Sequence, residues 1–144
     1  SIFSTKIRRG GELPLFEDGE ESRDFVHVDD VTDALLQGLL IPSAPNSIIN
    51  VGSGVATSVK EVASELSRAF GYEPKLVVTG QFRVGDIRHN YADISRLKTF
   101  LNVEPKVTLA AGLKRFAHWV EEQPVPEDRL EQANNELRAR NLMN

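Results

Sequence analysis

The sequence lacks several features that would define a function class. Its 144 residues include no cysteine, which excludes a disulfide framework, a thiolate nucleophile and a cysteine-based zinc site. No apolar run approaches the ~20 residues of a membrane-spanning helix. The longest run, residues 34–41, is interrupted by Gln37 and Gly38. There is also no signal-peptide pattern at the first residues. We therefore expect a cytoplasmic protein without a membrane partner.

Charge and histidine spacing exclude two further classes. The formal net charge of −4 and the pI near 5.4 leave no basic footprint for nucleic acid. The three histidines, His27, His89 and His118, form no i,i+4 pair, so we expect no metal site. No serine or threonine lies in a nucleophile elbow. We therefore expect no catalytic residue in this chain.

Two redox motifs are absent as well. No G-x-G-x-x-G fingerprint occurs, and neither tyrosine begins a Tyr-x-x-x-Lys pair, because Tyr72 is followed at that spacing by Leu76 and Tyr91 by Ser95. The segment Asn50-Val-Gly-Ser-Gly54 invites comparison with a phosphate loop but lacks the full spacing. We favour a strand-to-helix turn there. No residue of this chain is expected to bind a dinucleotide.

Apolar spacing predicts helices that alternate with short strands, which indicates an α/β or α+β domain. Ser58-Val-Lys-Glu61 is a capping box, and Asp29 or Asp30, Asp93 and Thr108 are further candidate helix caps. Residues 13–16 form a short apolar run. Strands are expected at residues 25–28, 47–51, 76–78 and 88–92. Helices are expected at residues 1–9, after the Asp29–Asp30 pair up to Pro42 and Pro45, and at 59–70, 94–101, 109–120 and 127–142.

The ends of the chain have distinct characters. The first ten residues have the pattern of the last turns of an amphipathic helix, so we expect the chain to be a piece of something longer. The segment Gln123-Pro-Val-Pro126 is a rigid break before a highly charged helix. We therefore expect a first unit at residues 1–123, incomplete at its beginning, and a helical tail at residues 124–144.

Two segments hold most of the functional information. Each begins with an arginine, at Arg23-Asp-Phe-Val-His-Val-Asp-Asp and at Arg83-Val-Gly-Asp86. Arginine binds phosphate with two parallel N–H groups, and an aspartate accepts hydrogen bonds from vicinal hydroxyls. Taken alone, each segment also suits a salt-bridged surface loop. For Arg23 the nearby candidate partners are Glu20, Glu21 and Asp24.

Several motifs in order resemble the C-terminal half of the extended short-chain dehydrogenase/reductase family, in the branch of NAD-dependent nucleotide-sugar epimerases and dehydratases. The resemblance covers about residues 1–121 and implies the substrate-binding part of a Rossmann-type fold. The matching positions are 13–16, Asp18-Gly19, 23–31, 50–54 with Ser58-Val59, Arg83-x-Gly-Asp86, Tyr91-Ala-Asp93, Gly112-Leu113 and Trp119.

The resemblance implies roles for five residues. Pro14 and Phe16 lie along the nucleotide base, Pro14 mainly through its backbone. Arg23 and Arg83 hold the diphosphate, and Asp86 contacts the ribose. In the family, NAD, the glycine-rich loop and the Tyr-x-x-x-Lys pair belong to the N-terminal half. We therefore expect the parent to be an isomerase that uses NAD, with no NAD bound by this chain alone.

Three hypotheses follow. The first is the UDP- or dTDP-sugar-binding half of an epimerase, completed by an N-terminal dinucleotide-binding half; within the family, a dehydratase is the alternative. The second is a stand-alone nucleotide-binding module. The third is a structural fragment whose exposed sheet edge and apolar helix faces drive formation of a homo-oligomer.

Overall fold

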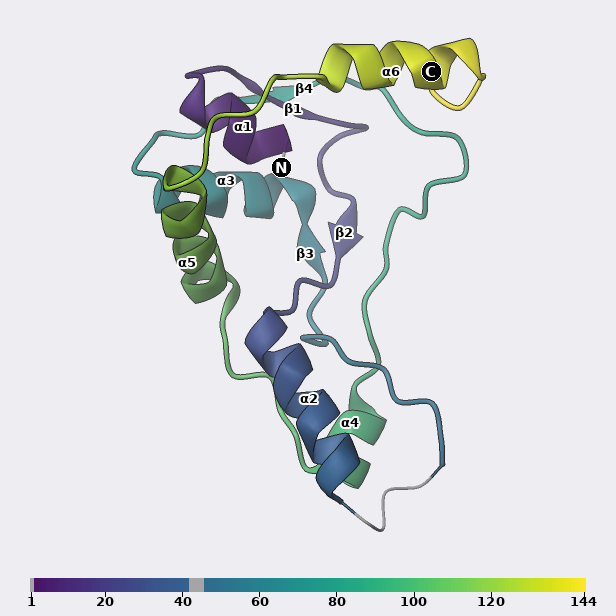
Figure 1. Cartoon of the computed structure of the whole chain (residues 1–144). Helices are drawn as coiled ribbons and strands as arrows, with labels where there is room; N and C mark the ends of the chain where they lie inside the picture. Colours follow the sequence, from purple (N-terminus) through teal and green to yellow (C-terminus); the bar gives the residue numbers. More distant parts are fainter. Residues whose placement is uncertain (1, 42–45) are drawn as a thin grey trace.

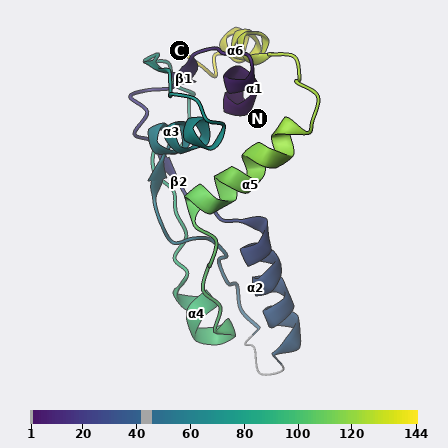
Figure 2. The same ribbon diagram turned by 90° about the vertical axis from the view of Figure 1, so that its left-hand side faces the viewer.

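The computed structural model describes residues 2–41 and 46–144, and within these residues it has six helices and four short strands. At one end of an elongated molecule, α2 (Val28–Leu40) packs beside α4 (Ser95–Leu101) (Figure 1). At the other end, α1 (Ile2–Arg8), α3 (Val59–Ala69) and α5 (Leu109–Glu121) lie around the strands (Figure 2). The α/β class expected from the sequence is confirmed.

The central pair of strands is parallel. β1 (Leu13–Leu15) pairs with β4 (Leu76–Val78), with Pro14 opposite Val77. Leu13 and Leu15 are each 1% exposed. Because side chains alternate along a strand, Pro14 points to the opposite face from these two leucines. The strand thus anchors one site candidate against the core.

Two apolar clusters hold the elements together. The larger one joins β1 to helices α1, α3 and α5 through Ile7, Leu13, Leu15, Ala63, Leu66, Phe70, Ala117 and Val120. The smaller one joins α2 to α4 through Ala34, Leu97, Leu101 and Val103. The capping box is confirmed at its serine, because Oγ of Ser58 accepts the N–H of Glu61 at 3.1 Å.

The start of α2 corrects two expectations. No strand forms at residues 25–28; β2 is Ser22–Arg23, antiparallel to β3 (Thr57–Ser58). The N-cap is His27, whose Nδ1 accepts the N–H of Asp29 at 3.1 Å, so the helix begins before the aspartates that we expected to cap it. Asp30 is instead buried and accepts the amides of Lys106 and Val107. Pro42 and Pro45 lie outside the described residues.

Two other expected strands do not form in the described part of the chain. Residues 47–51 are irregular, and Ile48 is 83% exposed. Residues 88–92 contribute one bridge, between His89 and Ser22. A strand forms only where a neighbour satisfies its N–H and C=O groups, and neither segment has a continuous neighbour. Asp93 accepts the N–H of Ser95, but the N-cap position of α4 belongs to Ile94.

The last helix, α6 (Leu130–Ala139), is shorter than the expected 127–142. Its approach is tied to α1, because Lys6 Nζ lies 2.9 Å from Asp128 Oδ2 and Arg9 donates to the carbonyl oxygen of Pro126. The division into residues 1–123 and 124–144 stays a prediction. Within the described ranges, every helix is too short or too polar to cross a membrane.

Candidate functional site

The loop after β4 brings Asp86 against Arg23 of β2. Nη2 of Arg23 donates to Oδ1 of Asp86 at 2.8 Å. Its Nη1 donates to the carbonyl oxygens of Ser22 and Arg88, which orient the guanidinium plane. The Arg23 side chain is 31% exposed and the Asp86 side chain 52%. Two of the predicted site residues therefore form a direct, solvent-accessible ion pair.

Asp86 is not among the acidic residues near Arg23 in the sequence that we considered as its partners. The acidic neighbours of Arg23 are engaged or turned elsewhere: Glu20 pairs with Lys60, and Asp24 binds the turn at Ser53. Among the described residues, Oε2 of Glu21 is buried without a hydrogen-bond partner. The guanidinium of Arg23 is thereby left for Asp86, a contact that only the folded chain creates.

A tight turn links this ion pair to a second contact. The N–H of Asp86 donates to the carbonyl oxygen of Arg83, and Gly85 at φ +81° supplies the left-handed conformation that the turn needs. Cζ of Arg83 lies 5.3 Å from the ring centroid of Phe16, which is a cation–π distance. No carboxylate in the described part of the chain pairs with Arg83. Its positive charge is thus available to an anion.

The structure thus brings four of the five predicted residues together in two contacts. Arg23 lies against Asp86, and Arg83 lies over Phe16. Pro14 precedes Phe16 by two residues in β1. Within the described residues it makes no polar contact with the other four. The role of Pro14 stays a prediction.

Ion pairs and a histidine contact hold residues 17–22 beside residues 88–89. Arg88 donates to Glu17 and, at 2.6 Å, to Asp18. The hydrogen bond from Arg88 lowers the pKa of Asp18 below its ordinary value. Oγ of Ser22 and Nδ1 of His89 lie 2.9 Å apart. These contacts fix the chain on both sides of the Arg23–Asp86 pair.

A polar depression of about 360 Å³ lies beside Arg23. Its lining also includes Asn50, Asn90 and Tyr91, and Tyr91 is 58% exposed. Asn90 had no assigned role, and the only signal for it is its place next to the Tyr91-Ala-Asp93 motif. The lining offers amide and hydroxyl groups next to the guanidinium of Arg23 and the carboxylate of Asp24, which suits a hydrogen-bonding ligand.

The turn at residues 50–54 contains an anion-binding arrangement that is filled from within the chain. Oδ1 of Asp24 accepts the N–H of Ser53 at 2.6 Å and its hydroxyl at 2.7 Å. Oδ2 accepts the amides of Gly54 and Ala92. A Cβ at Gly52 would lie 2.6 Å from Oδ2, so only glycine permits this approach. The amides of this turn are engaged by Asp24, as suits a structural turn and not a phosphate loop.

Opposing effects act on the pKa of Asp24. Burial raises the pKa. The hydrogen bonds from the Ser53 hydroxyl and from the three amides lower it by more than burial raises it, so the pKa falls below its ordinary value. The carboxylate of Asp24, the residue after Arg23, is therefore held in its charged form. Asp24 connects β2 to both the 50–54 turn and the segment that contains Tyr91.

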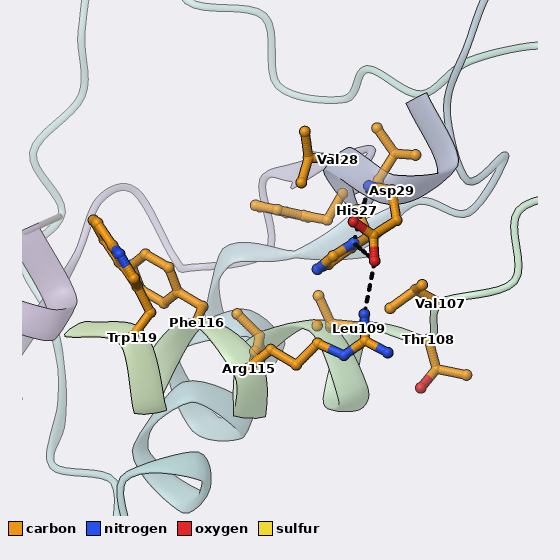
Figure 3. Close-up of a pocket in the computed structure, with 13 residues that line it drawn as sticks. His27, Val28, Asp29, Val107, Thr108, Leu109, Arg115, Phe116 and Trp119 are labelled. Atoms are coloured by element: carbon orange, nitrogen blue, oxygen red, sulfur yellow. Dashed lines mark hydrogen bonds and ion pairs between the residues drawn. The ribbon is translucent and has the colours of Figure 1, made fainter. Parts of the chain in front are cut away.

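A groove of about 520 Å³ lies elsewhere, between the start of α2 and α5 (Figure 3). Nη1 of Arg115 reaches across it to Oδ2 of Asp29 at 2.8 Å. Phe116 and Trp119 line its other end, and Trp119 is 56% exposed. The one sequence signal for this groove is that Trp119 flanks the apolar stripe of α5. Its mainly apolar lining suits an apolar group and not a diphosphate.

Comparison with known proteins identifies the class. The model of the NAD dependent epimerase/dehydratase family matches residues 1–52. A dTDP-L-rhamnose 4-epimerase of Burkholderia thailandensis is 35% identical over 123 residues, which are 85% of this chain and 34% of that protein. The chain is thus related to the NAD-dependent nucleotide-sugar epimerases.

Solved structures agree with this relationship. The UDP-glucose 4-epimerase of Thermotoga maritima, determined with UDP-glucose, matches with a TM-score of 0.75 and 36% identity over 84% of this chain. A protein named MoeE5, in complex with UDP-glucuronic acid and NAD, matches with a TM-score of 0.72 and 31% identity, also over 84% of this chain. This chain spans 38% and 41% of those chains, respectively. The fold is that of part of a short-chain dehydrogenase/reductase-type epimerase.

Proposed function

We propose that this chain is the nucleotide-diphosphate-binding portion of an NAD-dependent sugar epimerase that acts on a UDP- or dTDP-hexose. The observation that carries the proposal is the turn at residues 83–86. It presents Arg83 to Phe16 and Asp86 to Arg23 within four residues. Arg83, which pairs with no carboxylate of the described residues, a second arginine and an aromatic face thereby lie at one place.

Each group has a chemical role in this proposal. Arg83 and Arg23 donate charge-assisted hydrogen bonds to the diphosphate oxygens. A carboxylate has about four acceptor positions, so Asp86 accepts from ribose hydroxyls while Oδ1 keeps its bond to Arg23. Phe16 and the backbone of Pro14 lie along the base.

The chemical step is assigned to another part of the enzyme. This sequence has neither the G-x-G-x-x-G fingerprint nor the Tyr-x-x-x-Lys pair. In the proposal, an N-terminal dinucleotide-binding half would hold NAD, which would supply the hydride-transfer chemistry. The chain described here contributes uniform binding of the nucleotide, which gives affinity without stabilising the transition state.

Titration calorimetry with UDP and dTDP tests the binding role. Millimolar or tighter binding by the intact chain, lost in the Arg23→Ala/Arg83→Ala double variant, is the expected result. No heat at millimolar nucleotide contradicts it and favours the structural-fragment alternative.

Co-expression with the N-terminal half of a related epimerase tests the catalytic assignment. We expect NAD-dependent interconversion of nucleotide sugars only when both parts are present. A 4-keto-6-deoxy product would instead indicate the dehydratase alternative. Binding without any reconstituted activity would favour a stand-alone nucleotide-binding module.

A further inference from the structure

The last three residues of the chain pair with the loop that contains Arg83. Arg83 and Met143 form an antiparallel bridge. The N–H of Val84 donates to the carbonyl oxygen of Leu142 at 2.9 Å, and the N–H of Asn144 donates to that of Phe82 at 3.1 Å. Residues 142–144 therefore add a short strand beside residues 82–84. Residues 142–144 lie beyond the part of the sequence that resembles the family, whereas Arg83 lies within it.

The added strand is itself held in place at α6. Asn141 adopts a left-handed conformation at φ +57°, and the N–H of Leu142 closes the helix by donating to the carbonyl oxygen of Leu137 at 2.9 Å. Met143 is 6% exposed, so its side chain is buried where the strand meets the loop. Burial of this side chain and two backbone hydrogen bonds fix the segment against the loop.

The loop needs such support. Phe82, Arg83 and Val84 are all exposed, and the isolated bridge is the only strand-type pairing of residues 82–84 in the described chain. Exposed segments with few buried contacts open readily. Pairing on both sides of Arg83 restricts its backbone and holds the guanidinium over Phe16. Ordering a long side chain before a ligand arrives reduces the entropy lost on binding.

We propose that residues 142–144 form a strap that positions Arg83 for the nucleotide diphosphate. This inference rests on the proposed function, and it gives the charged C-terminal segment a role in ligand affinity. Its members are positioning residues, because they act through Arg83. Removal of the strap should weaken UDP binding by about three- to tenfold, as expected when one long side chain loses its ordering.

The test uses the full chain and two variants that break the strap. The first variant ends at Arg140. The second, Asn144→Pro, removes the N–H that reaches Phe82; Asn144→Ala keeps this N–H and is the matched control. UDP affinity is measured by calorimetry in the parent and in Arg83→Ala. In the parent chain, we expect both strap variants to weaken UDP binding and Asn144→Ala to leave it unchanged. In the Arg83→Ala background, we expect neither strap variant to change UDP affinity.

Amide hydrogen exchange separates the strap from the ligand. In the intact chain, the N–H of Val84 should be protected and should exchange faster in both variants. The N–H of Thr79, which donates to Leu15 of β1, should remain unchanged. An unprotected Val84 overturns the strap whatever the nucleotide result.

The remaining outcomes decide the positioning role. A protected Val84 together with unchanged UDP affinity in the truncated chain overturns it. An equal loss of affinity with and without Arg83 also overturns it, because the effect would then be merely structural. If the intact chain binds no UDP, the proposed function fails and the strap loses its role, while exchange at Val84 still shows whether it forms.

Discussion

Arg23 and Asp86 are 63 residues apart in the sequence, yet their side chains form an ion pair at 2.8 Å. The pair joins the end of β2 to the turn that also contains Arg83. Each partner has further hydrogen-bonding capacity, because a guanidinium has five donors and a carboxylate about four acceptor positions. The pair is therefore compatible with a ligand that contacts both residues at once.

Replacement of Arg23 should weaken UDP binding even when the substitution keeps the positive charge. Arg23→Ala removes charge-assisted hydrogen bonds and should reduce the affinity by about 10- to 100-fold. Arg23→Lys should recover little, because an ammonium cannot match two oxygens in one plane. Titration calorimetry of the three proteins measures the effect.

A matched control for this prediction is Arg96→Ala. Arg96 donates to the carbonyl oxygen of Ile48 in the other half of the molecule and is not among the predicted site residues. Its loss should leave UDP affinity within about twofold, a difference of less than 0.5 kcal/mol. Full recovery of affinity in Arg23→Lys would contradict the bidentate role.

Asp24 should make the stability of the fold depend on acid. Its pKa is lower in the folded chain than in the unfolded chain. The stabilisation is therefore fully present above the ordinary pKa near 3.8 and is lost as the pH falls through the folded value. Asp24→Asn should lower the free energy of unfolding at pH 7 by about 1–3 kcal/mol and flatten its decline below pH 5.

Urea unfolding between pH 3 and pH 7 measures this dependence. Glu73→Gln, in the exposed irregular segment between α3 and β4, is the matched control and should follow the parent chain closely. An Asp24→Asn profile parallel to that of the parent would show that the carboxylate makes no pH-dependent contribution.

Gly52→Ala should destabilise the same turn by overpacking. The new methyl group would lie 2.6 Å from both Oδ2 of Asp24 and Cβ of Ala92. We expect a loss of about 1–3 kcal/mol in urea unfolding. Gly11→Ala is the control, because there the nearest atom, the carbonyl oxygen of Lys6, is at an ordinary contact distance of 3.5 Å. Equal effects of the two substitutions would argue against the close approach.

Ser58→Ala tests the cap of α3. Loss of the hydrogen bond from the N–H of Glu61 should cost about 1 kcal/mol. Ser64→Ala, inside the same helix, should change the stability by less, because its hydroxyl only returns to the carbonyl oxygen of Lys60. Thermal unfolding of the two variants gives the comparison; a neutral Ser58→Ala would contradict the cap.

Local chemistry was readable from the sequence. The caps at Ser58 and Thr108 and the strand at Leu76–Val78 depend on residues close together in the chain, and each forms where the pattern predicts it. The partners of irregular segments were not readable. Residues 47–51 have strand-like composition, yet they form no strand in the described chain. A strand depends on a neighbour that its own sequence does not name.

The sequence by itself determined the family resemblance, the α/β class and the residue types available for a diphosphate. Only the tertiary structure decided that Arg23 pairs with Asp86, that Arg83 lies over Phe16, and that residues 142–144 brace the Arg83 loop. The physical reason is that a side-chain contact depends on distance in space. A long-range contact forms only after the core has positioned segments that lie far apart in the sequence.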